Sequence, residues 1–286
     1  MKERRRNTVR LMTLIIGSVI AAHASMAEAG SELDKCELVL EGTARIVEFD
    51  TYTVDGATAP IAGAMVRPDG EGPFPAIVLL HRVFGVEAPD CFKKELRKYR
   101  SWGYIALLVD SNSVPREVRT GTSGETPTGY SQPEQAADGL AGAAYLASLP
   151  SVRKSEIALV GYAFGGSAIL RSVSEASAEW TPASQPDGIR KRVYAAVAWH
   201  PACPPSLPNL GVPLLVITAA KDELNSSHAC VSMRVAGSSK ASTVEHAIFA
   251  DAGHNFDVDW FTEYDPAATE SAYRRVREFL AQSRAP

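Results

Sequence analysis

Short, continuous apolar runs recur along this chain, and they constrain its fold more than any other feature of the sequence. Such runs are typical of strands buried on both faces, and strands of this kind belong to parallel sheets. Stretches of helical character separate them, and alternation of strands with helices produces a doubly wound sheet. The apolar runs span residues 76–80, 105–109, 157–160 and 214–217, and the helical stretches span 91–102, 133–149, 164–178, 226–236 and 267–282.

Further strands complete the predicted sheet. Residues 44–52 and 60–67 are rich in β-branched side chains and flank the turn-like pair Asp55-Gly56, so we expect an antiparallel opening pair. Residues 193–199 and 244–249 also have strand character. The sequence therefore predicts an α/β fold with a mostly parallel central sheet of about eight strands and helices on both faces.

Charge is distributed unevenly along the chain. The 286 residues carry a formal net charge of −4, of which the first 29 residues contribute +3, so the remainder carries −7. An acidic body lacks the basic surface that nucleic-acid binding requires, and we expect no nucleic-acid partner. No internal repeat, low-complexity tract or linker interrupts this body, which favours one domain.

The amino-terminal segment is laid out like a secretory signal peptide. Residues 1–10 are basic, residues 11–22 form an apolar run, and small-residue cleavage sites follow at 22–24 and 27–29. The run is too short to span a bilayer comfortably, although an uncleaved membrane anchor stays open as the alternative. We expect a signal peptide over 1–29, one domain over 30–286, export to the periplasm or the exterior, and no membrane contact after cleavage.

The four cysteines all lie in the predicted exported body. Export places them in an oxidising compartment, and an even count permits two disulfides. We favour Cys203–Cys230, because each residue follows a predicted strand, which leaves Cys36–Cys91 as the second pair. Buried free thiols are the alternative. None of the cysteines has the CxxC spacing of a redox or zinc site.

The turn after the 157–160 strand has the pattern of a nucleophile elbow. Residues 161–166 (GYAFGG) join a strand to a helix, and glycines at such places allow a sharp turn and close packing of the helix. The central residue should be Ser or Cys, held at the top of the sheet. Here it is Ala163, which has no nucleophilic atom. A glycine-rich turn without a catalytic role is the alternative.

Two later strand ends carry the residues that normally accompany such an elbow. Asp222 follows the 214–217 strand, and His254 follows the 244–249 strand. The chain order of elbow, acid and histidine is that of the α/β-hydrolases. Each residue alone is typical of a loop, but together they are the expected acid and base of a catalytic triad.

The loop after the 76–80 strand is expected to complete the site. A loop at this place supplies one N–H group of an oxyanion hole, and the residue after the nucleophile supplies the other. The predicted donors are the backbone N–H groups of Val83 and Phe164. Simple packing is the alternative for the aromatic residues nearby. The substrate pocket is expected to be lined by His81, Arg82, Phe84 and Tyr162.

Several blocks of this sequence together resemble the dienelactone hydrolase family, over residues 45–282. The resemblance implies an α/β-hydrolase domain that cleaves esters or lactones with a Cys or Ser nucleophile, an Asp and a His. The blocks are HRVFGV (81–86), SWGYIALLVDS (101–111), QAADGLAGAAYLASLP (135–150), VGYAFGG (160–166), KDE (221–223) and AGHNFD (252–257).

Carried onto this sequence residue by residue, the resemblance places Asp222 and His254 at the acid and base positions. Ala163 stands at the nucleophile position. Members that hydrolyse dienelactone have a Glu in the oxyanion loop, where this chain has Arg82. Exported members that use Ser also lack that Glu, so Arg82 argues against dienelactone as the substrate and leaves ester hydrolysis open.

An alanine at the nucleophile position forbids the covalent route. By resemblance the chain is therefore a hydrolase of a small-molecule carboxylic ester or lactone, without a cofactor, in which the nucleophile is missing. Three interpretations stay open: a natural pseudoenzyme that keeps a binding pocket, an engineered Ser or Cys to Ala variant, and a weak hydrolase that activates water through His254. The oligomeric state also stays open.

Other features receive weaker interpretations. Ser167 is expected to lie below the site, one helical turn after Ala163, and not to act as a substitute nucleophile. No metal site is expected from His81, His200 and His254, because zinc would need tetrahedral placement and usually a further ligand. Solvated surface is expected for Asp257, Asp259, Glu263 and Asp265, and packing on the last helix for Trp260 and Phe261.

Overall fold

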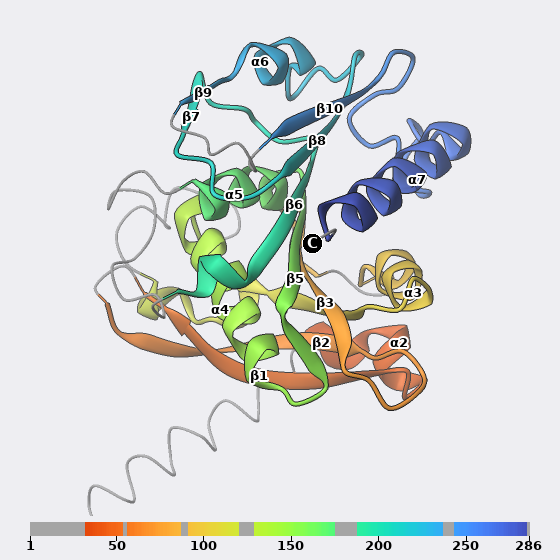
Figure 1. The fold of residues 1–286 in the computed structure, drawn as a ribbon. Coiled ribbons are helices and arrows are strands. Elements are labelled where there is room, and N and C mark those ends of the chain that lie inside the picture. The colour runs from red at the N-terminus through yellow and green to blue at the C-terminus, as the bar shows by residue number, and fades with distance from the viewer. Residues whose placement is uncertain are drawn as a thin grey trace, which may run out of the picture.

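A twisted eight-stranded sheet runs through the described part of the chain, with helices against both of its faces (Figure 1). The computed structural model describes residues 32–53, 56–86, 91–119, 129–174, 188–236 and 243–284. The predicted signal peptide, Asp55 of the predicted turn and the end of the predicted 164–178 helix lie outside these residues.

The strand order confirms the prediction of a mostly parallel sheet. It reads β1-β2-β4-β3-β5-β6-β8-β10. The first strand pairs antiparallel with the second, the second antiparallel with β4, and all strands from β4 to β10 are parallel to their neighbours. The strands are β1 (Ala44–Tyr52), β2 (Thr58–Val66), β3 (Phe74–Leu80), β4 (Ile105–Asp110), β5 (Val152–Tyr162), β6 (Val193–Trp199), β8 (Leu214–Ala219) and β10 (Val244–Phe249).

The longer helices cover the two faces of the sheet. Helices α4 and α5 lie on one face, and α3 and α7 lie on the other (Figure 1). These helices are α3 (Lys93–Ser101), α4 (Gln132–Ser148), α5 (Phe164–Val173) and α7 (Pro266–Ser283), and the shorter ones are α2 (Glu37–Leu40), α6 (Ser227–Ser232), η1 (Glu32–Lys35), η2 (Ser111–Ser113), η3 (Arg116–Val118) and η5 (Ile189–Arg192).

Local sequence explains where the two longest helices begin. Before α4, Ser131 and Glu134 form a capping box in which each side chain bonds the other residue's backbone N–H. Before α7, the Asp265 carboxylate accepts hydrogen bonds from two backbone N–H groups, and Pro266 opens the helix.

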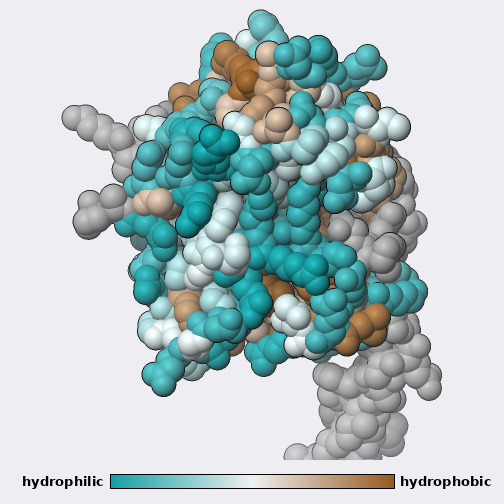
Figure 2. Space-filling view, turned by 90° about the vertical axis from the view of Figure 1, so that its right-hand side faces the viewer, coloured by the Kyte–Doolittle hydropathy of each residue, from teal (hydrophilic) through white to brown (hydrophobic). Residues whose placement is uncertain are grey.

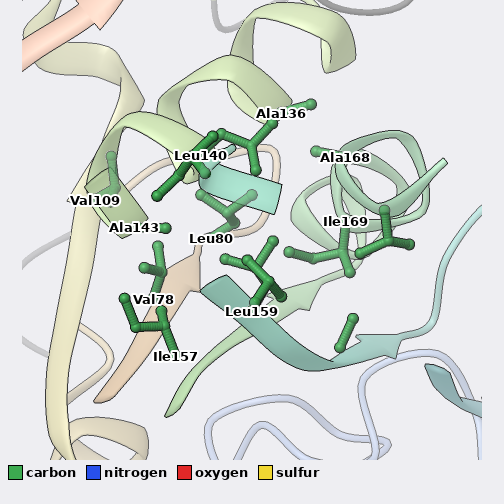
Figure 3. Close-up of a cluster of buried hydrophobic side chains, with 14 of the residues drawn as sticks. Val78, Leu80, Val109, Ala136, Leu140, Ala143, Ile157, Leu159, Ala168 and Ile169 are labelled. Atoms are coloured by element: carbon green, nitrogen blue, oxygen red, sulfur yellow. The ribbon is translucent and has the colours of Figure 1, made fainter. Parts of the chain in front are cut away.

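The central strands are buried on both faces, as their continuous apolar runs predict. Along β3, Val78 and Leu80 belong to the cluster under α4 and α5, whereas Ile77 and Leu79 belong to the cluster under α3 and α7. Figure 3 shows the first cluster, with Leu80 packed between residues of α4 and of the neighbouring strands. The outer surface over α3 and α7 is predominantly hydrophilic (Figure 2).

One predicted helix is wrong in part. The 226–236 stretch begins as α6 but ends at Ser232, and residues 234–236 form strand β9 (Arg234–Ala236). This short strand pairs with β7 (Ser206–Pro208), which places Val235 opposite the buried Leu207. Backbone pairing and burial of a β-branched side chain outweigh the helical pattern here.

The cysteines form the two expected pairs, Cys36–Cys91 and Cys203–Cys230, with Cα atoms 5.6 Å and 4.9 Å apart. The alternative of free thiols is wrong, because the described residues contain no free cysteine. The first bond ties the segment before β1 to the entrance of α3.

No helix of the described residues is long and apolar enough to cross a membrane.

Removal of either disulfide should lower the free energy of unfolding, because the unfolded chain then has more conformational freedom. The sequence separations are 55 for Cys36–Cys91 and 27 for Cys203–Cys230, so we expect losses of about 4 and about 3.5 kcal/mol. Urea denaturation of the two paired Cys→Ser variants checks this. An unchanged denaturation midpoint in both variants would contradict the expected contribution.

Candidate active site

The turn from β5 into α5 holds Ala163 in a strained conformation. Its φ of 51° and ψ of −107° lie outside the regions that alanine favours. The Ala163 N–H donates to the Trp199 carbonyl at 2.8 Å, and its own carbonyl accepts from the Ser167 N–H at 2.9 Å. Strain of this kind costs about 1–3 kcal/mol and is concentrated at functional sites. The predicted elbow geometry is therefore present, without a nucleophile.

Three glycines allow this turn because their neighbours leave no room for a side chain. A Cβ atom on Gly161 would lie 2.2 Å from the Gly165 carbonyl oxygen. One on Gly165 would lie 2.4 Å from the Leu80 carbonyl oxygen, and one on Gly166 would lie 2.5 Å from that of Trp199. The start of α5 thus rests directly on the backbone at the ends of β3, β5 and β6.

The predicted acid and base are in contact beside this turn. His254 Nδ1 lies 2.7 Å from Asp222 Oδ2, so the imidazole donates to the carboxylate. The other Asp222 oxygen accepts from the backbone N–H groups of Leu224 and Asn225 at 2.9 and 2.8 Å. Burial raises the pKa of Asp222, but the bonds from His254 and these N–H groups outweigh it, so the pKa falls below its usual value.

A pocket of about 310 Å³ opens above Ala163. His254 lines it, as do the oxyanion-loop residues Val83 and Phe84. It therefore combines the elbow, the predicted base and the predicted oxyanion loop. The complete lining is Arg82, Val83, Phe84, Gly85, Cys91, Phe92, Ala163, Leu224, His254, Asn255, Trp260 and Phe261.

The two predicted oxyanion donors come from two different segments of the chain. A turn closed by the bond from the Gly85 N–H to the Arg82 carbonyl carries Val83, and Phe164 is the first residue of α5. Among the described residues, neither the Val83 nor the Phe164 N–H donates to a backbone carbonyl. Both are therefore free of the backbone pairing that would disable an oxyanion donor.

Two of the residues predicted to line the pocket lie beneath it instead. The His81 ring is fully buried, where Nδ1–H donates to the Arg82 carbonyl at 2.8 Å and Nε2 accepts from the Ser111 N–H at 3.1 Å. The Tyr162 hydroxyl is also buried and bonds the Tyr99 hydroxyl at 3.2 Å. Tyr162 follows the alternation of β5 into the cluster under α3 and α7, whereas His81, just beyond the end of β3, turns toward Gln135 of α4.

The surface prediction is wrong for Asp257, and the packing prediction is wrong for Trp260, which is 60% exposed. Asp257 is only 1% exposed and accepts a 2.5 Å hydrogen bond from Arg82. Trp260 and Phe261 line the pocket. A buried arginine requires a nearby anion. In the sequence, this requirement of Arg82 is the one signal that could have indicated a buried role for Asp257.

Ser167 and His200 lie close to the site without being part of the pocket lining. The Ser167 hydroxyl accepts from the Ala202 N–H at 2.9 Å and faces the Ala163 carbonyl at 3.3 Å. His200, Asp222 and His254 each have one atom that could coordinate a metal ion, and these three atoms lie within 4.8 Å of one another. This group differs from the set of His81, His200 and His254 considered in the sequence, because the His81 ring points elsewhere. Asp222 and His254 of this group already bond each other.

Substitution of Gly165 by Ala should disrupt the elbow. Its Cβ atom would overlap the Leu80 carbonyl, which is backbone and has no room to yield. We expect a loss of more than about 3 kcal/mol in the free energy of unfolding, or failure to fold. The matched control is Gly42→Ala, where φ is +71° and open space surrounds the site, and where only about 1–2 kcal/mol of backbone strain is expected. Equal effects in urea denaturation would refute the packing argument.

The buried His81 should make the protein less stable in mild acid. Burial lowers its pKa from 6.5 to about 4, so between these values the unfolded chain binds a proton that the folded chain does not. The free energy of unfolding should therefore fall by up to about 3 kcal/mol as the pH drops from 6.5 to 4. Urea denaturation along this range measures the fall.

His81→Gln should remove most of that pH dependence. The matched control is His228→Gln, because His228 lies exposed on α6, and this variant should keep the fall. An undiminished fall in the His81 variant would show that other groups cause it.

Comparison with known proteins agrees with this architecture. The family model described as the dienelactone hydrolase family matches residues 61–284. A candidate carboxymethylenebutenolidase of Escherichia coli is 22% identical, over 91% of this chain and 95% of its own length. A second one, from Synechocystis, is 24% identical over 42% of this chain and 51% of its own length, so the match spans about half of that relative.

Solved structures show the same fold. A candidate dienelactone hydrolase from Klebsiella pneumoniae superposes with a TM-score of 0.61 at 19% identity, covering 83% of this chain and 99% of that one. Esterase 2 of Thermogutta terrifontis, in its apo form, gives a TM-score of 0.63 at 16% identity, covering 85% and 97%.

Proposed function

Because the chain belongs to the dienelactone hydrolase family, we propose that its pocket binds a small carboxylic ester or lactone and that it lacks the covalent route of hydrolysis. The observation that carries this proposal is the strained elbow residue Ala163, which faces a pocket shared with His254. A methyl group at that position cannot form an acyl-enzyme.

The remaining groups support binding of the ester carbonyl over Ala163. The N–H groups of Val83 and Phe164 are available to an oxyanion, and Phe164 also lies at the positive end of the α5 dipole. These groups need no side chain at the nucleophile position. Carbonyl recognition therefore survives the loss of the nucleophile.

Slow hydrolysis through water is the chemistry left to this site. With Nδ1–H bonded to Asp222, Nε2 of His254 is the basic nitrogen. It takes a proton from water as the oxygen attacks the carbonyl carbon, and the resulting imidazolium returns the proton to the departing alkoxide. Sites without a nucleophile keep roughly 10³–10⁴-fold acceleration over water, far below a complete triad. Ligand binding is therefore the main activity of the chain as it stands.

We also propose that residues 1–29 direct export and that the body acts in the periplasm or outside the cell. The two disulfides support this proposal, because such bonds persist in oxidising compartments. Amino-terminal sequencing of the purified protein tests it, and an intact Met1 would refute cleavage.

Restoring a nucleophile should restore catalysis. We expect Ala163→Ser and Ala163→Cys to raise kcat/KM for p-nitrophenyl acetate at least about 100-fold, since loss of a nucleophile costs far more than this in complete triads. The rate of p-nitrophenol release, followed by absorbance, measures the gain in kcat/KM.

Two further variants control this experiment. Adding His254→Ala to Ala163→Ser should abolish the gain, whereas adding Ser167→Ala should preserve it, because the Ser167 hydroxyl is occupied by the backbone. Fast turnover by the unsubstituted chain that survives His254→Ala would overturn the assignment of the site.

A further inference from the structure

We propose that the pocket selects uncharged, apolar acyl groups and disfavours ligands that carry a carboxylate, because Arg82 is already paired with Asp257. The inference rests on the proposed function, in which this pocket binds an ester. It assigns Arg82 and Asp257 as the pair that determines specificity.

Arg82 is the one residue of the described pocket lining with a permanent charge, and that charge is already committed. Its Nη2 donates to Asp257 Oδ2 at 2.5 Å. The guanidinium also lies against two aromatic rings, 5.1 Å from the centroid of Phe92 and 4.9 Å from that of Tyr162. Its side chain is only 14% exposed. A ligand carboxylate would therefore have to compete with a bond already made and fixed in place.

Asp257 is held in place beside Arg82, because its carboxylate is buried away from water. The side chain is fully buried, and its second oxygen lies 3.3 Å from Nε2 of His200. Burial raises the pKa of Asp257, but Arg82 and His200 outweigh this effect and hold the pKa well below its usual range. The carboxylate is thus ionised, and losing Arg82 would leave a buried anion without its cation.

The charges around the pocket floor also oppose an anionic ligand. The carboxylates of Asp222 and Asp257 both have lowered pKa values and stay ionised near neutral pH. Among the described residues Arg82 pairs with Asp257, whereas no arginine or lysine pairs with Asp222. Coulomb repulsion from the Asp222 carboxylate acts on an anion in a partly buried site, where water screens it poorly.

Apolar side chains make up most of the remaining lining. Phe84, Leu224 and Trp260 stand at the mouth and are 62%, 73% and 60% exposed. Deeper contacts come from Val83, Phe92 and Phe261. Large exposed apolar side chains gathered around one pocket indicate a surface that a ligand covers. The volume of about 310 Å³ suits a small ester with an aromatic or short aliphatic group.

A matched pair of stable esters tests this selection on the complete protein. The probes are ethyl 4-methylbenzoate and monoethyl terephthalate. At the same ring position, the first has a methyl group and the second has a carboxylate. Isothermal titration calorimetry near neutral pH should give at least about tenfold tighter binding of the methyl compound.

The variant Asp257→Asn should free Arg82 for the ligand. We expect the preference for the methyl compound to fall at least about tenfold in this variant, because an unpaired guanidinium binds a carboxylate strongly. Asp259→Asn is the matched control, since Asp259 lies two residues away, is exposed and does not line the pocket. It should keep the preference of the unsubstituted protein.

Each result has a distinct meaning. Equal or tighter binding of monoethyl terephthalate by the unsubstituted protein overturns the inference and leaves the proposed function standing. Binding of neither ester overturns both. An unchanged preference in folded Asp257→Asn overturns the role of the pair. If that variant does not fold, the preference of the unsubstituted protein still decides the proposed selectivity.

Discussion

The close approach of α5 to the strand ends is the constraint on which the site depends. Gly161, Gly165 and Gly166 let backbone touch backbone, with no space for even one methyl group. These contacts, together with the bond from the Ala163 N–H to Trp199, hold residue 163 at positive φ. None of them involves the side chain of residue 163. The geometry of a nucleophile elbow therefore persists although the nucleophile is absent.

The second constraint is that a buried charge needs a partner of opposite charge. Two arginine–aspartate pairs in this structure meet that need. Arg82 pairs with Asp257 beside the pocket, and Arg119 pairs with Asp138 at 2.9 Å on the other side of the sheet. The Asp138 carboxylate also accepts from Thr51 at 2.6 Å. A buried ion requires its partner and additional hydrogen bonds, because transfer from water is costly. The first pair consequently joins the loop after β3 to the loop after β10, and the second joins the segment after β4 to α4.

Sequence patterns could predict the features that depend on periodicity and on chain order. The apolar run over 76–80 predicts a doubly buried strand, and Asp222 and His254 meet because parallel strands end at one edge. The sequence could not reveal Asp257 as a buried ion, since an acidic residue in a polar stretch is typical of surface. It also could not place Trp260 at the pocket, because that contact depends on how the loop before α7 returns across the sheet. The inward direction of His81 follows only from the bonds of its ring to the Arg82 carbonyl and the Ser111 N–H.

Retention of the strained elbow bears on what the pocket does now. Conformations such as that of Ala163 cost about 1–3 kcal/mol, and with an alanine the strain serves no covalent step. Relief would require α5 to move, and such a movement would separate the glycine contacts that join it to β3 and β6. Close packing of the core under α5 opposes that movement. The fold thus holds the pocket above Ala163 and the His254–Asp222 pair together as one unit, whether or not residue 163 carries a nucleophilic atom.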